Sequence, residues 1–529
     1  VYAGWVPQCI RPWIYVLMAF CFQFSNDMYL GAMNNIIGER GIMREDVLMC
    51  LYATLTGMAF YFPLLFRMKF RFSNKLLLMS AASVILVCNL LTMFPLPITW
   101  ALCVVCGMAK IQGTFECMSS IQLWMTPKRD FGVFFPLLHI VLLTSIEYSA
   151  YLAAWFAYEA HWQLMHWFII ALMVGVLLVQ MVFTHHFHAM PQIVPLRGID
   201  WLGALLWIVF TLQMVYLLNY GDWLDWWNSS TFRLLCGTSL LTLAVCLQRM
   251  WHHPQPFFEP AMWNYRYVVP VILLIGVVEM LFSSEHVIEM VYYEEVMHYA
   301  DHTYEWLNQW SLPGIWAGCL FSLGWLKLMR WNVYRLIALA LFVFALYAGG
   351  FYFLIDASIS IDLLRIPIIC RGFSYAVLCI AFMWCLHAIM SFEHFFQALS
   401  VFNVLHMLLG GLIGAALHAL GLKYYVADGF ARYSQYVDSV GISARHTDFS
   451  DLMQRLVEGL LAQAVKIEFG WTLLAALFLG MLMLLWDVPM VRHQIKHIPT
   501  WPSVGMGVWR KYQRGRRLHR LRKMRRVLV

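Results

Sequence analysis

Residues 163–184 read QLMHWFIIALMVGVLLVQMVFT, without a single Asp, Glu, Lys or Arg. A helix of about 20 apolar residues is long enough to cross the hydrocarbon core of a bilayer, so this stretch predicts a transmembrane helix. Similar runs lie near 12–35, 47–66, 76–95, 97–124, 132–157, 201–219, 232–250, 267–290, 306–329, 333–355, 364–390, 396–420 and 470–489. The sequence therefore predicts an all-α polytopic membrane protein with fourteen transmembrane helices.

The composition argues against a soluble fold. Hydrophobic residues make up 62% of the 529 residues and charged residues only 12%, whereas soluble domains average about 25% charged residues. The 13 cysteines lie mostly within the apolar runs and lack the spacing of a zinc site. The net charge of +7 is concentrated in the segment Arg510–Arg526. We expect this basic tail to contact anionic membrane lipid and expect no nucleic-acid partner.

Loop charge orients the predicted spans, because cytoplasmic loops are rich in Lys and Arg. The loops after every second span are basic, and the loops between them are acidic or neutral, as in 221–227, 294–305 and 356–362. Arg40, Arg44 and Arg233 are exceptions. This alternation predicts fourteen spans with both termini in the cytoplasm.

Ionisable side chains inside membrane spans are expensive and usually functional. Asp27 and Glu147 lie in polar stretches of the first and fifth predicted spans, and we expect them to carry protons, because burial makes a carboxyl titrate closer to neutral pH. A purely structural hydrogen bond is the alternative for each. The candidate residues for a substrate pathway are Lys110, Glu116, Glu279 and Arg371.

Lys110 and Glu116 are six residues apart and do not face each other on one helix. We therefore expect Lys110 to neutralise Asp27 or Glu147 on another span.

Glu279, Glu285 and Glu289 approach the external end of their span, and we expect only Glu279 to lie deep. His387, His406 and His418 are expected to pack rather than to relay protons.

The polar stretch 423–468 predicts a long external insert between the last two spans. Within it, 449–467 has helical periodicity, which predicts a short amphipathic helix on the membrane surface or on a partner.

Enzyme signatures are absent from the sequence: it has no GxSxG, no GxxxxGK[ST] and no HExxH. We expect a transporter rather than an enzyme, with no cofactor and the proton gradient as its energy source.

Several motifs resemble the major facilitator superfamily, and within it the fourteen-span drug:proton antiporters of the EmrB/QacA type. Asp27 followed by Ala32–Asn35 is similar to the first-span pattern of that family, and Lys110–Gly113 is similar to part of its fourth-span motif. The Trp-rich stretch 219–226 and the long insert before the last span are also typical. The sequence departs from the family in the loop after span 2, at Ala109, and in 144–150, which lacks the Gly and Pro of the antiporter motif.

This resemblance implies two six-helix bundles, 1–190 and 263–490, with two inserted helices in 191–262, an external insert at 421–469 and a cytoplasmic tail at 491–529. It implies proton-coupled export of amphipathic small molecules across a bacterial inner membrane. The partners that this resemblance allows are a periplasmic adaptor and an outer-membrane channel. A dedicated exporter of one lipid-like, siderophore or pigment-type metabolite is an alternative. A non-transporting scaffold on a degenerate transporter fold is another.

Overall fold

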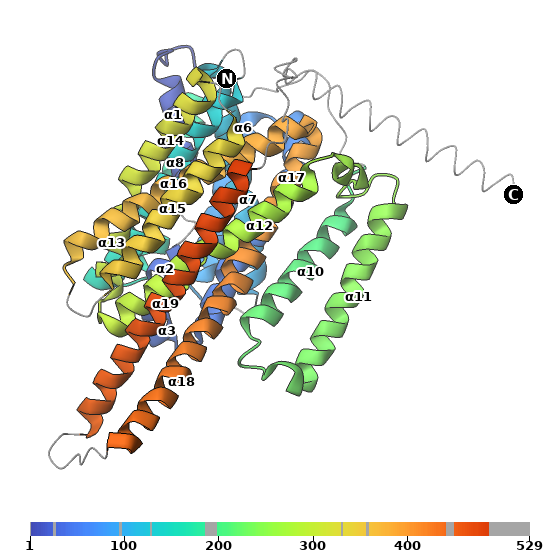
Figure 1. Cartoon of the computed structure of the whole chain (residues 1–529). Coiled ribbons are helices and arrows are strands. Elements are labelled where there is room, and N and C mark those ends of the chain that lie inside the picture. The colour runs from blue at the N-terminus through green and yellow to red at the C-terminus, as the bar shows by residue number, and fades with distance from the viewer. Residues whose placement is uncertain are drawn as a thin grey trace, which may run out of the picture. The chain divides into compact units, whose positions relative to one another are not determined.

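The chain folds into apolar helices (Figure 1), as described by a computed structural model for residues 2–24, 28–94, 98–126, 130–185, 198–329, 332–355, 359–440 and 449–485. Among these residues the β-structure is limited to isolated bridge positions, such as the bridge between Tyr2 and Thr184. Twelve helices in the described ranges are long and apolar enough to cross a membrane. The protein is therefore an all-α polytopic membrane protein.

The α-helices are α1 (Arg11–Gln23), α2 (Met28–Gly31), α3 (Met33–Arg40), α4 (Arg44–Tyr61), α5 (Leu65–Arg71), α6 (Asn74–Thr92), α7 (Thr99–Met125), α8 (Phe131–Glu159), α9 (Leu164–Phe183), α10 (Trp201–Asn219), α11 (Ser230–His252), α12 (Val268–Phe282), α13 (Asp301–Asn308), α14 (Ser311–Leu323), α15 (Val333–Leu354), α16 (Ile361–Ile389), α17 (Phe392–Leu405), α18 (Ala415–Val440) and α19 (Phe449–Leu485). Short 3₁₀ turns are η1 (Phe62–Leu64), η2 (Trp226–Asn228) and η3 (Pro260–Asn264). Turns of π-helix are η4 (Glu285–Glu289), η5 (Tyr292–Val296), η6 (Gly324–Met329) and η7 (His406–Gly414).

The twelve long helices coincide with twelve of the fourteen predicted spans, so the count of fourteen is not confirmed. The other two predicted spans are divided into shorter helices. Near 12–35 these are α1, α2 and α3, and near 306–329 they are α13 and α14 followed by η6. Pro313 lies in the first turn of α14, where a missing backbone N–H is tolerated.

The helix predicted at 449–467 is present, but it is the first part of α19 rather than a separate surface helix. α19 contains 37 residues, which corresponds to about 55 Å at 1.5 Å per residue, whereas the hydrocarbon core is about 30 Å thick. α18 and α19 lie side by side (Figure 1). The two helices therefore form a hairpin that is longer than a membrane span.

The chain divides into two compact units. Unit 1 comprises Val1–Leu273, Met383–Val404 and Pro489–Val529, and unit 2 comprises Leu274–Phe382 and Leu405–Val488. In unit 1, α7 packs against α1, α4 and α6, and in unit 2, α15 packs against α19.

A reciprocal glycine contact joins α4 to α7 in unit 1. A Cβ atom added to Gly57 would overlap the carbonyl oxygen of Val104, and one added to Gly107 would overlap that of Thr54. Small residues of this kind let two membrane helices approach closely. The backbones of α4 and α7 are therefore in direct contact.

The same contact joins α14 to α16 in unit 2. Gly314 faces the carbonyl oxygen of Ile369, and Gly372 faces that of Ser311, again without room for a Cβ atom. In both units each helix of the pair contributes one glycine. The residue three positions before that glycine contributes the carbonyl group that contacts the glycine of the other helix. The two units thus repeat one helix-pairing device in the same register.

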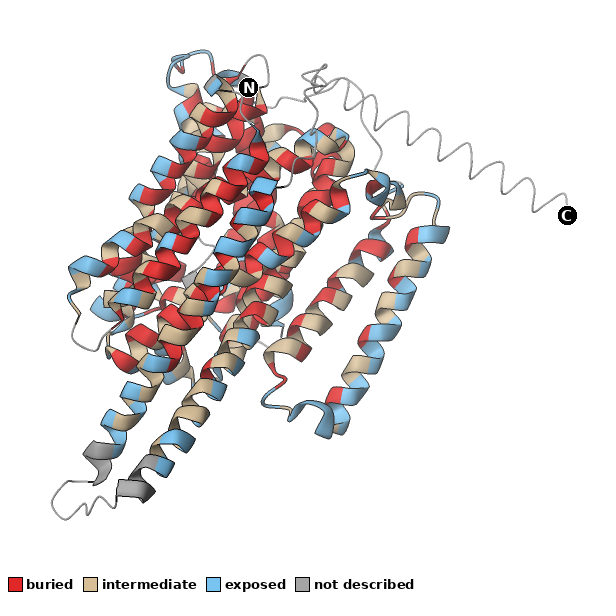
Figure 2. Cartoon of the chain, viewed as in Figure 1, coloured by how far each residue is buried: buried red, intermediate tan, exposed pale blue. Residues whose placement is uncertain are grey.

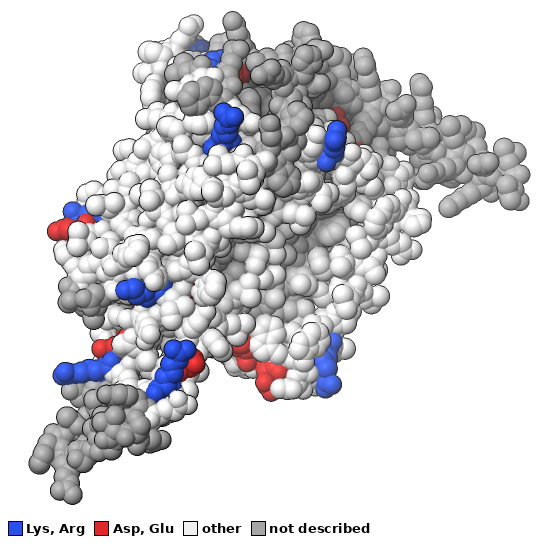
Figure 3. Space-filling model, in the orientation of Figure 1, with Lys and Arg blue, Asp and Glu red and all other residues white. Residues whose placement is uncertain are grey.

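Many large apolar side chains are exposed on the surface of the protein. α11 is exposed along much of its length (Figure 2), with Leu234, Leu240 and Leu241 each more than two-thirds exposed. Most of the surface in view in Figure 3 carries neither acidic nor basic side chains. Such a surface suits a lipid environment.

Candidate functional site

Glu279 of α12, one of the predicted pathway residues, has 6% of its side chain exposed. Its Oε2 atom lies 2.7 Å from Nδ1 of His406, which is 38% exposed and begins η7. Two glycines of η7 allow this approach, since a Cβ atom on Gly410 would lie 3.3 Å from Glu279 and one on Gly414 would overlap Ser283 Oγ. Turns of π-helix are often found at functional sites. The glycines of η7 therefore allow His406 to contact the buried carboxyl group of Glu279.

The hydrogen bond between Glu279 and His406 contains one proton. Either the imidazole Nδ1–H donates to the carboxylate, or a protonated carboxyl group donates to the bare nitrogen. Histidine is the side chain that ordinarily titrates nearest to neutral pH. Both forms are compatible with the 2.7 Å contact.

Arg371 of α16, another predicted residue, is 2% exposed. Its Nη1 atom donates to Glu289 Oε2 at 2.6 Å. Its Nη2 atom lies 3.1 Å from Glu285 Oε1 and donates to Asn308 Oδ1 at 3.1 Å. The next residue, Gly372, makes the close contact with α14, so helix packing fixes where this guanidinium lies.

A third pair lies between the two helices of the hairpin. His418 Nδ1 of α18 is 3.1 Å from Glu468 Oε2 of α19. Gly421 makes room for this carboxylate, because a Cβ atom there would overlap Glu468 Oε1. We interpret this pair as a structural brace between α18 and α19.

Glu116 of α7 is fully buried and has a partner that the sequence did not identify. Its Oε2 atom accepts a hydrogen bond from Lys69 of α5 at 3.0 Å, and Gln112 donates to its Oε1 atom at 3.1 Å. Lys69 also donates to Ser119. Lys69 belongs to the predicted basic loop after the second span, so this ion pair ties the loop to α7.

Lys110 is 3% exposed and lines a cavity of about 10 Å³ together with Asn89 and Thr92, room for about one water molecule. Glu147 is half-buried on α8. Asp27 lies outside the described residues. The pairing of Lys110 with Asp27 or Glu147 stays a prediction.

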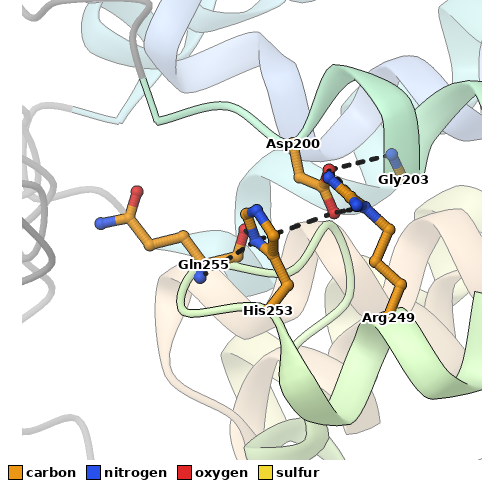
Figure 4. Close-up of polar contacts among 5 residues, drawn as sticks. All are labelled: Asp200, Gly203, Arg249, His253 and Gln255. Carbon is orange, nitrogen blue, oxygen red and sulfur yellow. Dashed lines mark hydrogen bonds and ion pairs between the residues drawn. The ribbon is translucent and has the colours of Figure 1, made fainter. Parts of the chain in front are cut away.

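The predicted pair of central spans forms the hairpin of α10 and α11, which is closed at one end by an ion pair (Figure 4). Arg249 donates to Asp200 Oδ1 through Nη2 at 2.6 Å and through Nε at 2.8 Å. The same oxygen accepts the amide of Gly203 at 2.9 Å and so caps α10. His253 Nδ1 lies 4.0 Å from the other carboxylate oxygen.

The other end of this hairpin is anchored to α4. Asn219 donates to the carbonyl oxygen of Glu45 at 2.7 Å, and the Tyr220 hydroxyl donates to Asp46. Burial, together with this hydrogen bond to a carboxylate, raises the pKa of Tyr220. Polar contacts therefore attach this end of the hairpin to α4 within unit 1.

The histidines divide into two groups. His387 packs among the rings of Phe131, Phe135 and Phe395, as expected. His406 and His418 instead pair with carboxylates, and whether either relays protons stays a prediction. No local pattern could reveal these pairs, because each joins residues far apart in the sequence.

Burial also differs from expectation at two acidic residues. Glu289 is fully buried, although only Glu279 of its span was expected to lie deep. Glu468, expected at the end of the polar insert, is 7% exposed. Helix packing, rather than distance from a span end, decides how far each carboxylate is shielded.

No protein-family model matches the sequence, and no curated protein matches it. Solved structures similar to the chain include one described as a proton-dependent oligopeptide transporter, with a TM-score of 0.55, 12% identity and coverage of 90% of this chain and 98% of that chain. Another is the human organic anion transporter MFSD10, with a TM-score of 0.54, 9% identity and coverage of 90% and 100%.

A variant of the nucleoside transporter NupG matches with a TM-score of 0.52 and 13% identity, covering 90% of this chain and 99% of that chain. At these identities the likeness concerns the fold. The similarity extends over nearly the whole of each transporter, and the described helices are long enough to span a membrane. The chain therefore has the fold of these transporters.

Proposed function

We propose that this protein is a proton-coupled secondary transporter that exports amphipathic small molecules. The observation that carries the proposal is the hydrogen bond between Glu279 and His406, a buried carboxyl group joined to a partly exposed imidazole within a membrane-spanning unit. Transporters place coupling-ion sites inside the membrane on discontinuous or irregular helices. The π-helical turn η7 at His406 is such an irregularity.

Two arguments support proton coupling in particular. A carboxylate inside a membrane is costly unless it is paired or protonated, so the charge state of Glu279 is linked to the contact with His406. A proton that arrives from the exposed side of the imidazole changes this contact, and with it the packing of α12 against η7. The same fold is found in a transporter described as proton-dependent.

Further proton carriers and pathway residues form part of the proposal. Asp27 and Glu147 are our candidate proton carriers in unit 1. Lys110, Glu116 and Arg371 are candidates for the substrate pathway, together with Glu279. The proton gradient supplies the energy in this scheme, without a bound cofactor.

We place the transporter in a bacterial inner membrane, with both termini in the cytoplasm and the tip of the α18–α19 hairpin outside. A hairpin longer than the membrane is thick offers a contact surface for a periplasmic adaptor, which would connect export to an outer-membrane channel. Cross-linking from Tyr424, which is 67% exposed on α18, to a co-expressed adaptor tests this arrangement. Cross-links from Leu346, which is 65% exposed on α15, serve as the control.

The test of proton coupling uses the purified chain in liposomes and a fluorescent amphipathic dye. We expect a pH gradient to drive dye movement by the unmodified chain. Glu279→Gln should lower this rate by about tenfold or more, because it removes a proton-transferring group. Glu468→Gln is the matched control, since it alters an equally buried carboxyl group that contacts a histidine of the same helical span.

Equal rates for Glu279→Gln and the unmodified chain would refute the role of the pair. Dye movement that ignores the pH gradient would refute proton coupling altogether. Movement of one dedicated lipid-like, siderophore or pigment-type compound, and of no dye, would favour the dedicated exporter. A chain that moves nothing would favour the scaffold.

A further inference from the structure

Arg371 is one cation between two carboxylates. Glu289 is fully buried and lies 2.6 Å from the guanidinium, and Glu285 is 21% exposed and lies 3.1 Å from it. Two ionised carboxylates would leave one negative charge uncompensated in a weakly polarisable environment, which is costly. One additional positive charge, or one proton, restores the balance.

The neighbouring titratable groups do not provide that charge. Among the described residues, the groups that face the cluster from η5, α13 and α15 are phenols and one further acid: Tyr292, Tyr293, Tyr304, Glu305 and Tyr347. α19 presents the apolar ring of Phe469 to Tyr347. None of these described groups adds a positive charge, so a proton is the simplest ligand that restores the balance.

Burial and the contact with Arg371 indicate where the proton resides. Glu289 is fully buried, whereas 21% of the Glu285 side chain is exposed. An uncompensated charge costs more free energy at the fully buried carboxylate. The Oε2 atom of Glu289 accepts the hydrogen bond from Arg371 Nη1, which leaves Oε1 as the oxygen that takes the proton.

We infer that Arg371, Glu285 and Glu289 form a second proton-binding site, with the exchangeable proton on Oε1 of Glu289. Loss of this proton leaves Arg371 shared between two ionised carboxylates and gives the cluster a net negative charge. The existence of the site does not depend on the proposed function. Only its role in transport, as a proton bound in addition to the one at Glu279, rests on that function.

Infrared spectroscopy of the purified chain in lipid nanodiscs tests the site, because a protonated carboxyl group has a C=O stretching band that an ionised one lacks. At neutral pH we expect Glu289→Gln to remove one such band. Glu285→Gln should remove the same band although Glu289 is intact, because one carboxylate then faces one guanidinium and the charges balance. Glu468→Gln is the control and should leave the band unchanged.

Loss of the band in both variants supports the site, and retention in both overturns it. Loss in Glu285→Gln alone would place the proton on Glu285 and overturn the assignment to Glu289. Loss in Glu289→Gln alone would overturn the charge argument. If Glu289→Gln does not fold, Glu285→Gln still provides a decisive variant, because Glu285 is partly exposed. A failure of the proposed transport would appear in the dye assay and would leave this band unaffected, so the two results are independent.

Discussion

Glu279 and His406 share a hydrogen bond of 2.7 Å although 127 residues separate them in the sequence. The bond joins a carboxyl group that is 6% exposed on α12 to an imidazole that is 38% exposed. This arrangement differs from the brace formed by His418 and Glu468, in which both side chains are nearly buried. The difference in exposure is the reason that we assign proton exchange to the first pair and a structural role to the second.

Replacing His406 by Ala should slow proton-driven dye transport by about tenfold or more, since a proton-transferring imidazole contributes at least that much. His418→Ala removes an imidazole with the same kind of contact from the same helical span. It should leave the rate per folded molecule unchanged. Equal effects of the two substitutions, measured in liposomes at one pH gradient, would contradict the distinction between the two pairs.

The sequence predicted the helices well and their partners poorly. Apolar runs locate twelve long helices because each polar residue in a membrane-spanning segment is costly in lipid, whichever helices surround it. Pairs such as Lys69 with Glu116 depend on how helices pack, which a hydrophobic run does not encode. The candidate positions Glu279 and Arg371 were found because charge inside a span is rare, but their partners became visible only in three dimensions.

The glycine contact between α4 and α7 predicts a loss of stability in Gly57→Ala. The added methyl group overlaps the Val104 carbonyl oxygen, and forced overpacking of this kind costs about 1–3 kcal/mol. Gly175→Ala is the control, because a Cβ atom there has nothing within 4 Å. Thermal unfolding followed by tryptophan fluorescence should show a lower midpoint for the first variant only. Equal midpoints would show that α4 and α7 do not touch.

Arg249 and Asp200 should be energetically coupled, since the carboxylate is 1% exposed and accepts two guanidinium hydrogens. A double-mutant cycle with Asp200→Asn and Arg249→Gln should give a coupling of about 1–3 kcal/mol. The same cycle on Asp428 and Arg432, an exposed pair on α18, should give well under about 1 kcal/mol. Additive effects at Asp200 and Arg249 would mean that the ion pair does not close the hairpin.

The α18–α19 hairpin should come apart locally in Gly421→Ala, because the new methyl group displaces the Glu468 carboxylate from its contact with His418. Gly459→Ala, on α19, meets nothing within 4 Å and should be harmless. Limited proteolysis measures the effect as faster cleavage within the hairpin. Cleavage at the same rate in both variants would count against the brace.

Some features of the site had no signal in the sequence at all. The matching registers of Gly57 and Gly314 became visible only when the carbonyl groups that they contact were known. The π-helical turn at His406 follows from packing against α12 and not from a recognisable motif. The predicted helix at 449–467 had the correct periodicity, but that periodicity cannot tell a separate helix from the first part of a longer one.

The most direct test of the central claim follows protons themselves. Liposomes containing the purified chain and an internal pH indicator are loaded with dye and diluted, so that dye leaves down its gradient. Proton-coupled export predicts that the lumen acidifies with the unmodified chain and with Glu468→Gln. With Glu279→Gln, the lumen should not acidify, including for the dye that still leaves down its own gradient. Acidification by Glu279→Gln at the unmodified rate would contradict the account.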